Sequence, residues 1–241
     1  DALPIFAKPA GYNALAYYCS TADAPCNAKP YSLGTQKVLE YGRVKTTDGS
    51  IKYMLNWPAF GNDYYINIVE KKPIEREAHY NAAKNFTRGF IYFLQTELKQ
   101  PNIGLATDEV NEGMAYMPYN REGRRLKGKV RLNIDHIAKP FNYNLYRTGI
   151  SVGDYPVDHH HARYNGKVPP IPFPSVPSFN IPLGALMPEK IQGLVVCEKG
   201  ISVSNIANGT TRLQPVVLLT GQAAGALAMV SLQQNINVQD V

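Results

Sequence analysis

The clearest pattern of apolar positions lies in residues 74–99, which read IEREAHYNAAKNFTRGFIYFLQTELK. Aromatic and small residues recur there at helical spacing: Phe86, Gly89, Phe90, Phe93 and Leu94. Pro73 stands before the segment, Glu75 lies in its first turn, and Pro101 follows it, as is typical of helix ends. The spacing predicts a helix over 74–99 whose aromatic face is buried in a core.

Shorter alternating segments predict strands in the first third of the chain. Asp48-Gly49 separates two alternating runs within 36–69 and indicates a hairpin. A second β-like run covers Tyr64–Val69. Residues 1–35 are rich in Pro and Gly and predict loop, with one short strand around Ala14–Cys19.

Residues 121–132, REGRRLKGKVRL, combine a basic run with an alternating one. Leu126, Gly128, Val130 and Leu132 share one parity, whereas Lys127, Lys129 and Arg131 take the other. The alternation predicts a strand with a solvated, charged face. The preceding arginines at 121, 124 and 125 remain candidates for binding an anionic group.

Seven prolines fall within residues 167–188 and predict an extended surface loop, because proline is excluded from helix interiors and central strands. After this loop, Leu194–Cys197 has the apolar composition of a short buried strand.

The C-terminal stretch 208–230, NGTTRLQPVVLLTGQAAGALAMV, joins a polar turn to a helix made largely of Gly and Ala. Pro215 suits the first helical position, with Gln214 or a neighbour at the cap, which leaves the N–H groups of Val216 and Val217 free. Two faces follow from helical spacing. One is flat and consists of Gly221, Ala224, Gly225 and Ala228. The other is an apolar ridge of Leu219, Ala223, Leu227 and Val230.

The flat face has two interpretations. Glycine costs about 1 kcal/mol in a helix, so close packing in an ordinary core is one reason for it. The other is a planar or anionic ligand at the helix N-terminus, where the helix dipole favours negative charge. Arg212 adds a cation there.

Length and charge narrow the class of protein. The 241 residues suffice for one large domain or two small ones. The net charge of +6 permits an anionic ligand, but the charges are dispersed, so we expect no nucleic-acid partner. Cys19, Cys26 and Cys197 leave at least one unpaired thiol, and a disulfide between the first two stays open. We find no signal peptide and no apolar run near the ~20 residues of a membrane span, which predicts a soluble chain.

Residues 154–164, DYPVDHHHARY, place three consecutive histidines beside Asp158 and Arg163. In an extended segment His159 and His161 point one way and His160 the other, so we expect no metal site. A solvated or hydrogen-bonded histidine cluster and a substrate-contacting or acid–base histidine both remain open.

The run LVVCEKGISVSNIANGTTRLQPVVLLTGQAAGALA resembles the C-terminal signature of a group of bacterial FAD-dependent oxidoreductases. REGRRLKG, GDYPVDHHH and IPLGALMP are similar to earlier blocks of that family, so the resemblance spans roughly residues 115–230. It implies a flavin-contacting set: Gly209, Arg212, Pro215, Val216, Gly221, Gln222 and Ala223. On the substrate side it implies Asp158 and His160, with Arg163 beside them, and His160 as the residue that orients substrate or moves a proton.

The family needs a G-x-G-x-x-G turn for the cofactor pyrophosphate, and no Gly in this chain is followed by another two positions on. We therefore expect a fragment of a larger flavoenzyme that lacks its N-terminal FAD-binding domain. Its fold class would be α+β, mainly antiparallel sheet with packed helices, plus a C-terminal strand-loop-helix that completes the missing domain. Residues 1–190 would form the substrate-binding domain and 191–241 the return to the FAD-binding domain. Alone, the chain would be inactive and bind FAD weakly or not at all.

The resemblance implies hydride transfer between a substrate and flavin. The substrate would be a small molecule, with a saccharide-related one suggested by labels within the family, and the compartment would be that of an exported or periplasmic bacterial protein. The alternative is a carbohydrate-binding or other non-catalytic module, because 16 Tyr and Trp57 offer flat faces for stacking on sugars.

Overall fold

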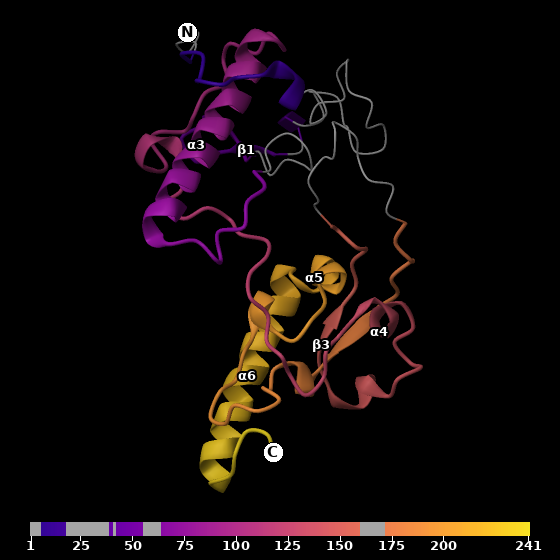
Figure 1. The fold of residues 1–241 in the computed structure, drawn as a ribbon. Helices are drawn as coiled ribbons and strands as arrows, with labels where there is room; N and C mark the ends of the chain where they lie inside the picture. Colours follow the sequence, from indigo (N-terminus) through magenta and orange to yellow (C-terminus); the bar gives the residue numbers. More distant parts are fainter. Residues whose placement is uncertain (1–5, 18–38, 41, 55–63, 160–171) are drawn as a thin grey trace. The chain divides into compact units, whose positions relative to one another are not determined.

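The structure is a computed structural model that describes residues 6–17, 39–40, 42–54, 64–159 and 172–241. The chain divides into two compact units (Figure 1). The first comprises residues 1–118 and 161–170, and the second comprises 119–160 and 171–241. The boundary predicted at residue 190 divides the chain by proposed function, whereas these units are defined by compactness. That boundary stays a prediction.

Helix α3, Pro73–Thr96, organises the first unit and confirms the helix predicted from the spacing. Pro73 occupies its first turn, and the Lys72 N–H donates to Glu75 Oε2 at 2.8 Å. Phe90, Phe93 and Leu94 are buried, so the aromatic face is core, as predicted.

The N-terminal segment packs on that face through Tyr17. Burial raises the pKa of Tyr17 to about 12, so its hydroxyl stays protonated and donates to Phe86 O at 2.9 Å. The strand predicted at Ala14–Cys19 is wrong for its described part, because a 3-10 turn, η1 (Ala14–Ala16), forms there. Asn13 Oδ1 accepts from the Leu15 N–H at 3.0 Å and starts that turn.

The hairpin predicted around Asp48-Gly49 is confirmed. Strands β1 (Arg43–Lys45) and β2 (Ile51–Tyr53) pair antiparallel, and Gly49 has a φ of 87° in the connection. The strand predicted at Tyr64–Val69 does not form. There the Asn67 side chain accepts from the Val69 N–H at 3.1 Å, a local bond that competes with strand pairing.

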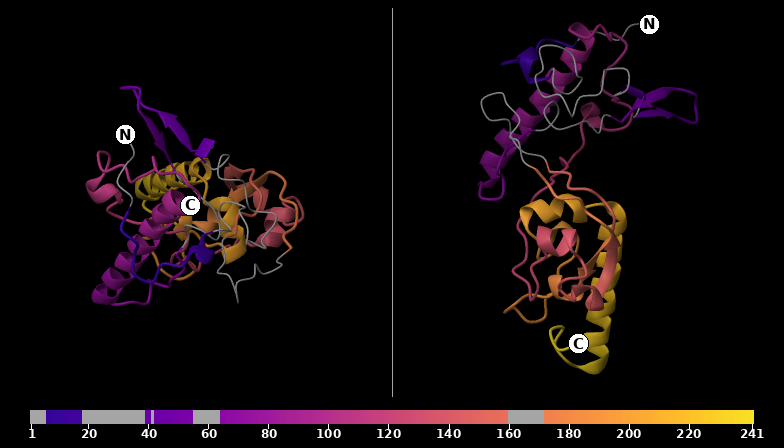
Figure 2. Two further views of the ribbon diagram at one scale, coloured as in Figure 1. Left: turned by 90° about the horizontal axis from the view of Figure 1, so that it is seen from above. Right: turned by 90° about the vertical axis from the view of Figure 1, so that its right-hand side faces the viewer.

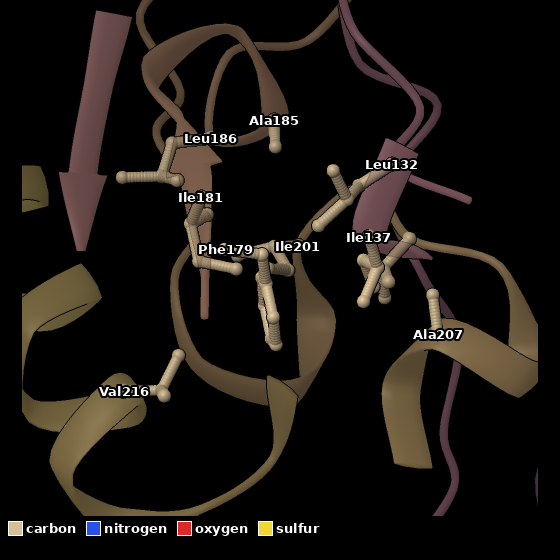
Figure 3. Close-up of a cluster of buried hydrophobic side chains, with 10 residues drawn as sticks. Leu132, Ile137, Phe179, Ile181, Ala185, Leu186, Ile201, Ala207 and Val216 are labelled. Carbon is tan, nitrogen blue, oxygen red and sulfur yellow. The ribbon is translucent and has the colours of Figure 1, made fainter. Parts of the chain in front are cut away.

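Strands β3 (Gly149–Gly153) and β4 (Phe179–Pro182) form an antiparallel sheet in the second unit. Figure 3 shows the core around it, with Phe179 and Ile181 of β4 among its buried side chains. The prediction of a surface loop over 167–188 is therefore wrong for 179–187. A sheet of two strands tolerates proline because each strand has an edge that needs no N–H donor.

The segment 126–132 keeps the predicted alternation but forms no regular strand. Leu132 is buried and Leu126, Gly128 and Val130 are partly buried, whereas Lys127, Lys129 and Arg131 are exposed. Its N–H groups bond to scattered carbonyls, including Gly200 O and Ser202 O, and it makes two isolated bridges. The strand predicted at Leu194–Cys197 is also absent, and Leu194 is exposed.

Three helices complete the second unit: α4 (Ile134–Ala138), α5 (Asn205–Thr211) and α6 (Gln214–Gln234). The polar turn predicted at the start of 208–230 is wrong, because residues 208–211 end α5, which begins at a Ser204 cap. Figures 1 and 2 show α6 along one side of this unit, with its C-terminal turns extending beyond the small sheet. Short 3-10 turns also occur within each unit. The first unit contains η3 (Asn111–Gly113), and the second contains η4 (Leu145–Thr148), η5 (Leu183–Ala185) and η6 (Glu198–Gly200).

The fold is α+β, as predicted, and both described sheets are antiparallel. Each has two strands, so the expectation of a mainly antiparallel sheet overstates the strand content of the described residues. Helices α3 and α6, of 24 and 21 residues, contribute more of the regular structure.

Candidate functional site

Arg212 and Asp158 form the best-defined polar contact among the predicted site residues. Arg212 Nη2 donates to Asp158 Oδ2 at 2.9 Å and to the backbone oxygen of the same residue at 2.7 Å. The Arg212 side chain is 7% exposed and that of Asp158 is 39% exposed. Two residues that the sequence assigned to opposite sides of a reaction centre therefore form one ion pair.

Gly209 brings the two backbones of this ion pair together. The Asp158 N–H faces Gly209 O at 3.4 Å, and a Cβ at position 209 would lie 2.9 Å from Asp158 O. Any side chain would push these backbones apart. The small size of Gly209 thus has a packing reason inside the chain, alongside the predicted contact with a cofactor.

Tyr119 gathers three cations around its exposed ring. Arg212 Nη1 donates to its hydroxyl oxygen at 3.3 Å. The Arg121 guanidinium lies 5.6 Å from the ring centroid and the Lys199 ammonium lies 4.6 Å from it. Cation–π attraction holds both charges near the ring. Tyr119 and Lys199 were not predicted, because neither periodicity nor a motif distinguishes them.

Asn208 connects α5 to the segment that carries these charges. Its Nδ2 donates to Arg121 O at 3.3 Å and to Glu122 Oε1 at 3.0 Å. The residue is 1% exposed, and its Oδ1 atom has no hydrogen-bond partner among the described residues. A buried acceptor without a donor calls for an explanation, such as water or a bound molecule.

The histidine cluster is described only at its first member. His159 Nε2 lies 2.7 Å from Asn205 Oδ1, in the first turn of α5. This is a hydrogen-bonded histidine, one of the two alternatives left open by the sequence. His160 and Arg163, both predicted as catalytic, lie outside the described residues, as does the Cys19–Cys26 pair.

The first turn of α6 combines exposed and buried residues of the predicted cofactor set. Leu213 is the N-cap and gives no side-chain bond; Gln214 and Pro215 are exposed. Val216 is buried in the core, and its carbonyl accepts from Ser151 Oγ at 3.4 Å. Val216 can therefore offer a ligand only its backbone N–H. The prediction of a free N–H at Val217 is wrong, because this group donates to Leu213 O at 2.9 Å, and Pro215 occupies the second helical position rather than the first.

The flat face of α6 is open at its two glycines, whereas Ala224 packs against the core, so close packing explains only part of this face within the described residues. A Cβ built at Gly221 or Gly225 would meet no atom within 4 Å. Leu218 and Leu232 are spaced seven residues from Gly225, share its face, and are 72% and 77% exposed. Of the predicted ridge, Leu227 is buried and Ala223 packs on the core, but Leu219 is exposed. Gln222 is exposed.

At 21 residues, α6 also corrects the expectation that no apolar segment approaches the length of a membrane span. By length and composition alone this helix could cross a membrane, and 17% of its most apolar window is buried. The core helices of soluble proteins satisfy the same criteria, so the absence of a membrane span stays a prediction.

A metal site does not emerge from the described residues, since no three His, Cys, Asp or Glu side chains among them could jointly hold an ion. The described part of the site thus consists of a fixed cation, an exposed phenol ringed by charges, and a helix with an open glycine face. Such a site suits a flat or anionic organic molecule.

Comparison with known families agrees with that chemistry. The family model described as FAD dependent oxidoreductase matches residues 3–241. The chain therefore belongs to the FAD-dependent oxidoreductase family. No curated protein and no solved structure matches it.

Proposed function

We propose that this chain provides the substrate-binding part and one wall of the flavin site of an oxidoreductase that moves a hydride between a small-molecule substrate and FAD. The observation that carries the proposal is the open Gly221–Gly225 face of α6, on the helix whose N-cap directly follows the fixed cation of Arg212. Bound FAD would supply the hydride acceptor or donor and a ring system that becomes negatively charged on reduction.

The residues present fit such a group. Gly221 and Gly225 leave space that a flat ring could occupy against the backbone. The N–H groups of Gln214 and Val216 at the start of α6 and the Arg212 guanidinium favour negative charge nearby, an effect typically worth about 0.3–1 kcal/mol for a helix terminus. The predicted set of Gly209, Arg212, Pro215, Val216, Gly221, Gln222 and Ala223 stays the proposed cofactor wall.

Asp158 is proposed here to position Arg212 rather than to react. Its carboxylate and its carbonyl both accept from Nη2, so the guanidinium plane is fixed before a ligand arrives. Preorganised charge of this kind costs little reorganisation during a reaction. His160 and Arg163 stay the proposed residues for moving a proton and orienting substrate.

The open face of α6 also needs a partner surface. Leu218, Met229 and Leu232 are exposed on the helix, and an exposed apolar strip usually marks an interaction site. We propose that it packs against an N-terminal dinucleotide-binding domain that carries the G-x-G-x-x-G turn. For the substrate we propose a saccharide-related molecule, on the family resemblance and the exposed ring of Tyr119.

The test compares the chain alone with the chain joined to a dinucleotide-binding domain that carries the G-x-G-x-x-G turn. FAD titration followed by flavin fluorescence should give no micromolar binding to the chain alone. The joined protein should purify with flavin absorbance bands and retain FAD.

Gly225→Leu in the joined protein should weaken FAD retention or domain association, because it fills the open face. Ala226→Leu provides the matched control, since it adds the same side chain about 100° around the helix. Micromolar FAD binding by the chain alone, or equal effects of the two substitutions, would contradict the proposal.

A further inference from the structure

Lys199 and Tyr119 form a pair of hydrogen-bond donors that the FAD-dependent function does not use. Lys199 Nζ donates to Asn120 O at 3.0 Å and lies 4.6 Å from the Tyr119 ring centroid. An ammonium has three donors, so further N–H groups remain for a ligand. The Tyr119 hydroxyl accepts from Arg212 Nη1, which leaves its own hydrogen to donate.

The charges around this pair are mostly positive. Arg212 and Arg121 lie on the same phenol, at its hydroxyl and near its ring. The carboxylate of Asp158 forms an ion pair with Nη2 of Arg212, and the carboxylate of Glu122 forms one with Arg125. Glu198, next in sequence to Lys199, is exposed and forms no ion pair with it.

Like charges gathered around one side chain repel one another, and a negative group bound beside them would offset that repulsion. The Tyr119 ring is 64% exposed, so a ligand can approach it from solvent in the second unit. A hydroxyl donor and an ammonium held over the same ring match the oxygens of a carboxylate, sulfate or phosphate.

We propose that Tyr119 and Lys199 bind an oxyanion group of the substrate, next to the cation of Arg212. The assignment of this oxyanion to the substrate rests on the function proposed above, because that function places the reacting part of the substrate at α6. The pyrophosphate of FAD is the other possible source, and it belongs with the G-x-G-x-x-G turn that this chain lacks.

Titration of the isotopically labelled full chain with inorganic phosphate tests the site directly. At constant ionic strength, the amide NMR signals of Tyr119 and Lys199 should shift saturably with phosphate and not with chloride. Lys199→Gln should weaken phosphate binding by about tenfold, as expected for one charge-assisted hydrogen bond. Lys199→Arg should retain most of the binding.

Lys190→Gln is the matched control, because it removes an exposed lysine charge from the same unit and should leave phosphate binding unchanged. Thermal unfolding checks that each variant is folded. Tyr119→Leu removes the hydroxyl donor and should independently weaken phosphate binding. Absence of saturable shifts, or equal losses in the Lys190 and Lys199 variants, would overturn the proposal.

Adding FAD to the flavin-binding joined protein distinguishes the substrate from FAD as the source of the oxyanion. If FAD displaces phosphate and Lys199→Gln weakens FAD binding by the same factor, the oxyanion comes from the cofactor and the assignment to substrate is wrong. Phosphate binding that persists while the joined protein fails to retain FAD would instead contradict the proposed function and leave the oxyanion site standing.

Discussion

Arg212 donates two hydrogen bonds to one residue, and the carboxylate and the carbonyl of Asp158 accept one each. Since the guanidinium is almost completely buried, it depends on these oxygens to offset its lost hydration. Gly209 makes the arrangement possible, because its lack of a side chain allows the two backbones to approach. At the residue scale, the site is thus a cation fixed by local geometry.

Asp158→Asn should therefore destabilise the second unit by about 1–2 kcal/mol, less than for a fully buried pair because Asp158 is partly exposed. The change removes the negative charge and preserves the carbonyl contact. Urea unfolding measures the loss. Glu189→Gln breaks the exposed pair between Lys127 and Glu189 and should cost less than about 0.5 kcal/mol. Equal losses for the two variants would show that the Arg212 pair has no special role.

At the scale of elements, short helices here depend on side-chain caps. Helix α4 has only five residues, and its first turn is closed by Asn133 and His136. The Asn133 side chain accepts from the N–H groups of Asp135 and His136, and the neutral His136 ring accepts from the Asn133 N–H at 3.2 Å. This is a capping box with histidine in the position usually held by Glu or Gln.

His136 should make the stability of this region depend on pH. Burial lowers its pKa below the ordinary value near 6.5, with opposing contributions from Asp135 and a backbone hydrogen bond to Arg131. The folded state therefore favours the neutral ring. Its contribution is complete above about pH 6.5 and is lost as the pH falls from there through the lower folded-state pKa.

His136→Gln retains the capping acceptor without a titrating group. The stability of the natural protein, measured by urea unfolding, should fall more steeply between pH 7 and pH 5 than that of the variant. An NMR titration should place the His136 midpoint below 6.5. Parallel pH profiles for the two proteins would contradict this assignment.

At the scale of the whole molecule, the chain has two separate principal cores. The buried cluster around α3 belongs to the first unit, and the cluster around β4 belongs to the second. They have no buried residue in common. Local opening of one core should therefore leave the other protected.

Gly89→Ala tests this separation. A Cβ at position 89 would lie 2.2 Å from the Tyr17 hydroxyl, and overpacking typically costs about 1–3 kcal/mol, partly offset by about 1 kcal/mol of helix propensity. Hydrogen exchange should become faster in α3 and remain unchanged over residues 179–187. Gly221→Ala, which meets no neighbouring atom, should slow exchange in α6. Faster exchange in both cores of the Gly89 variant would show that they unfold together.

Local patterns predicted those features whose cause is local. The helix at α3 follows from the spacing of its aromatic residues, the hairpin from Asp48-Gly49, and the solvated face of 126–132 from alternation. The family resemblance likewise rested on contiguous motifs, and the match over residues 3–241 confirms it. Arg212 and Gly209 were included in the predicted site because they lie within such a motif.

Several of the wrong predictions have one origin: the backbone hydrogen-bonding groups of a segment can find partners in more than one conformation. The seven prolines of 167–188 predicted a loop, yet β4 forms there and includes Pro182, which a sheet of only two strands tolerates. Asn208 to Thr211 predicted a turn, yet Ser204 caps a helix that includes them. The apolar run at Leu194 predicted a buried strand, but no paired strand forms there.

The sequence by itself determined the family, the helical and alternating segments, and the small-residue composition of α6, since each depends on neighbouring residues and their spacing. Tertiary structure alone decided which charges meet. Asp158 is 54 residues from Arg212, and Tyr119 is 93 residues from it. Contacts over such separations depend on how the core brings distant segments together, and no local spacing encodes them. For the same reason, only the structure revealed that the glycine face of α6 is open.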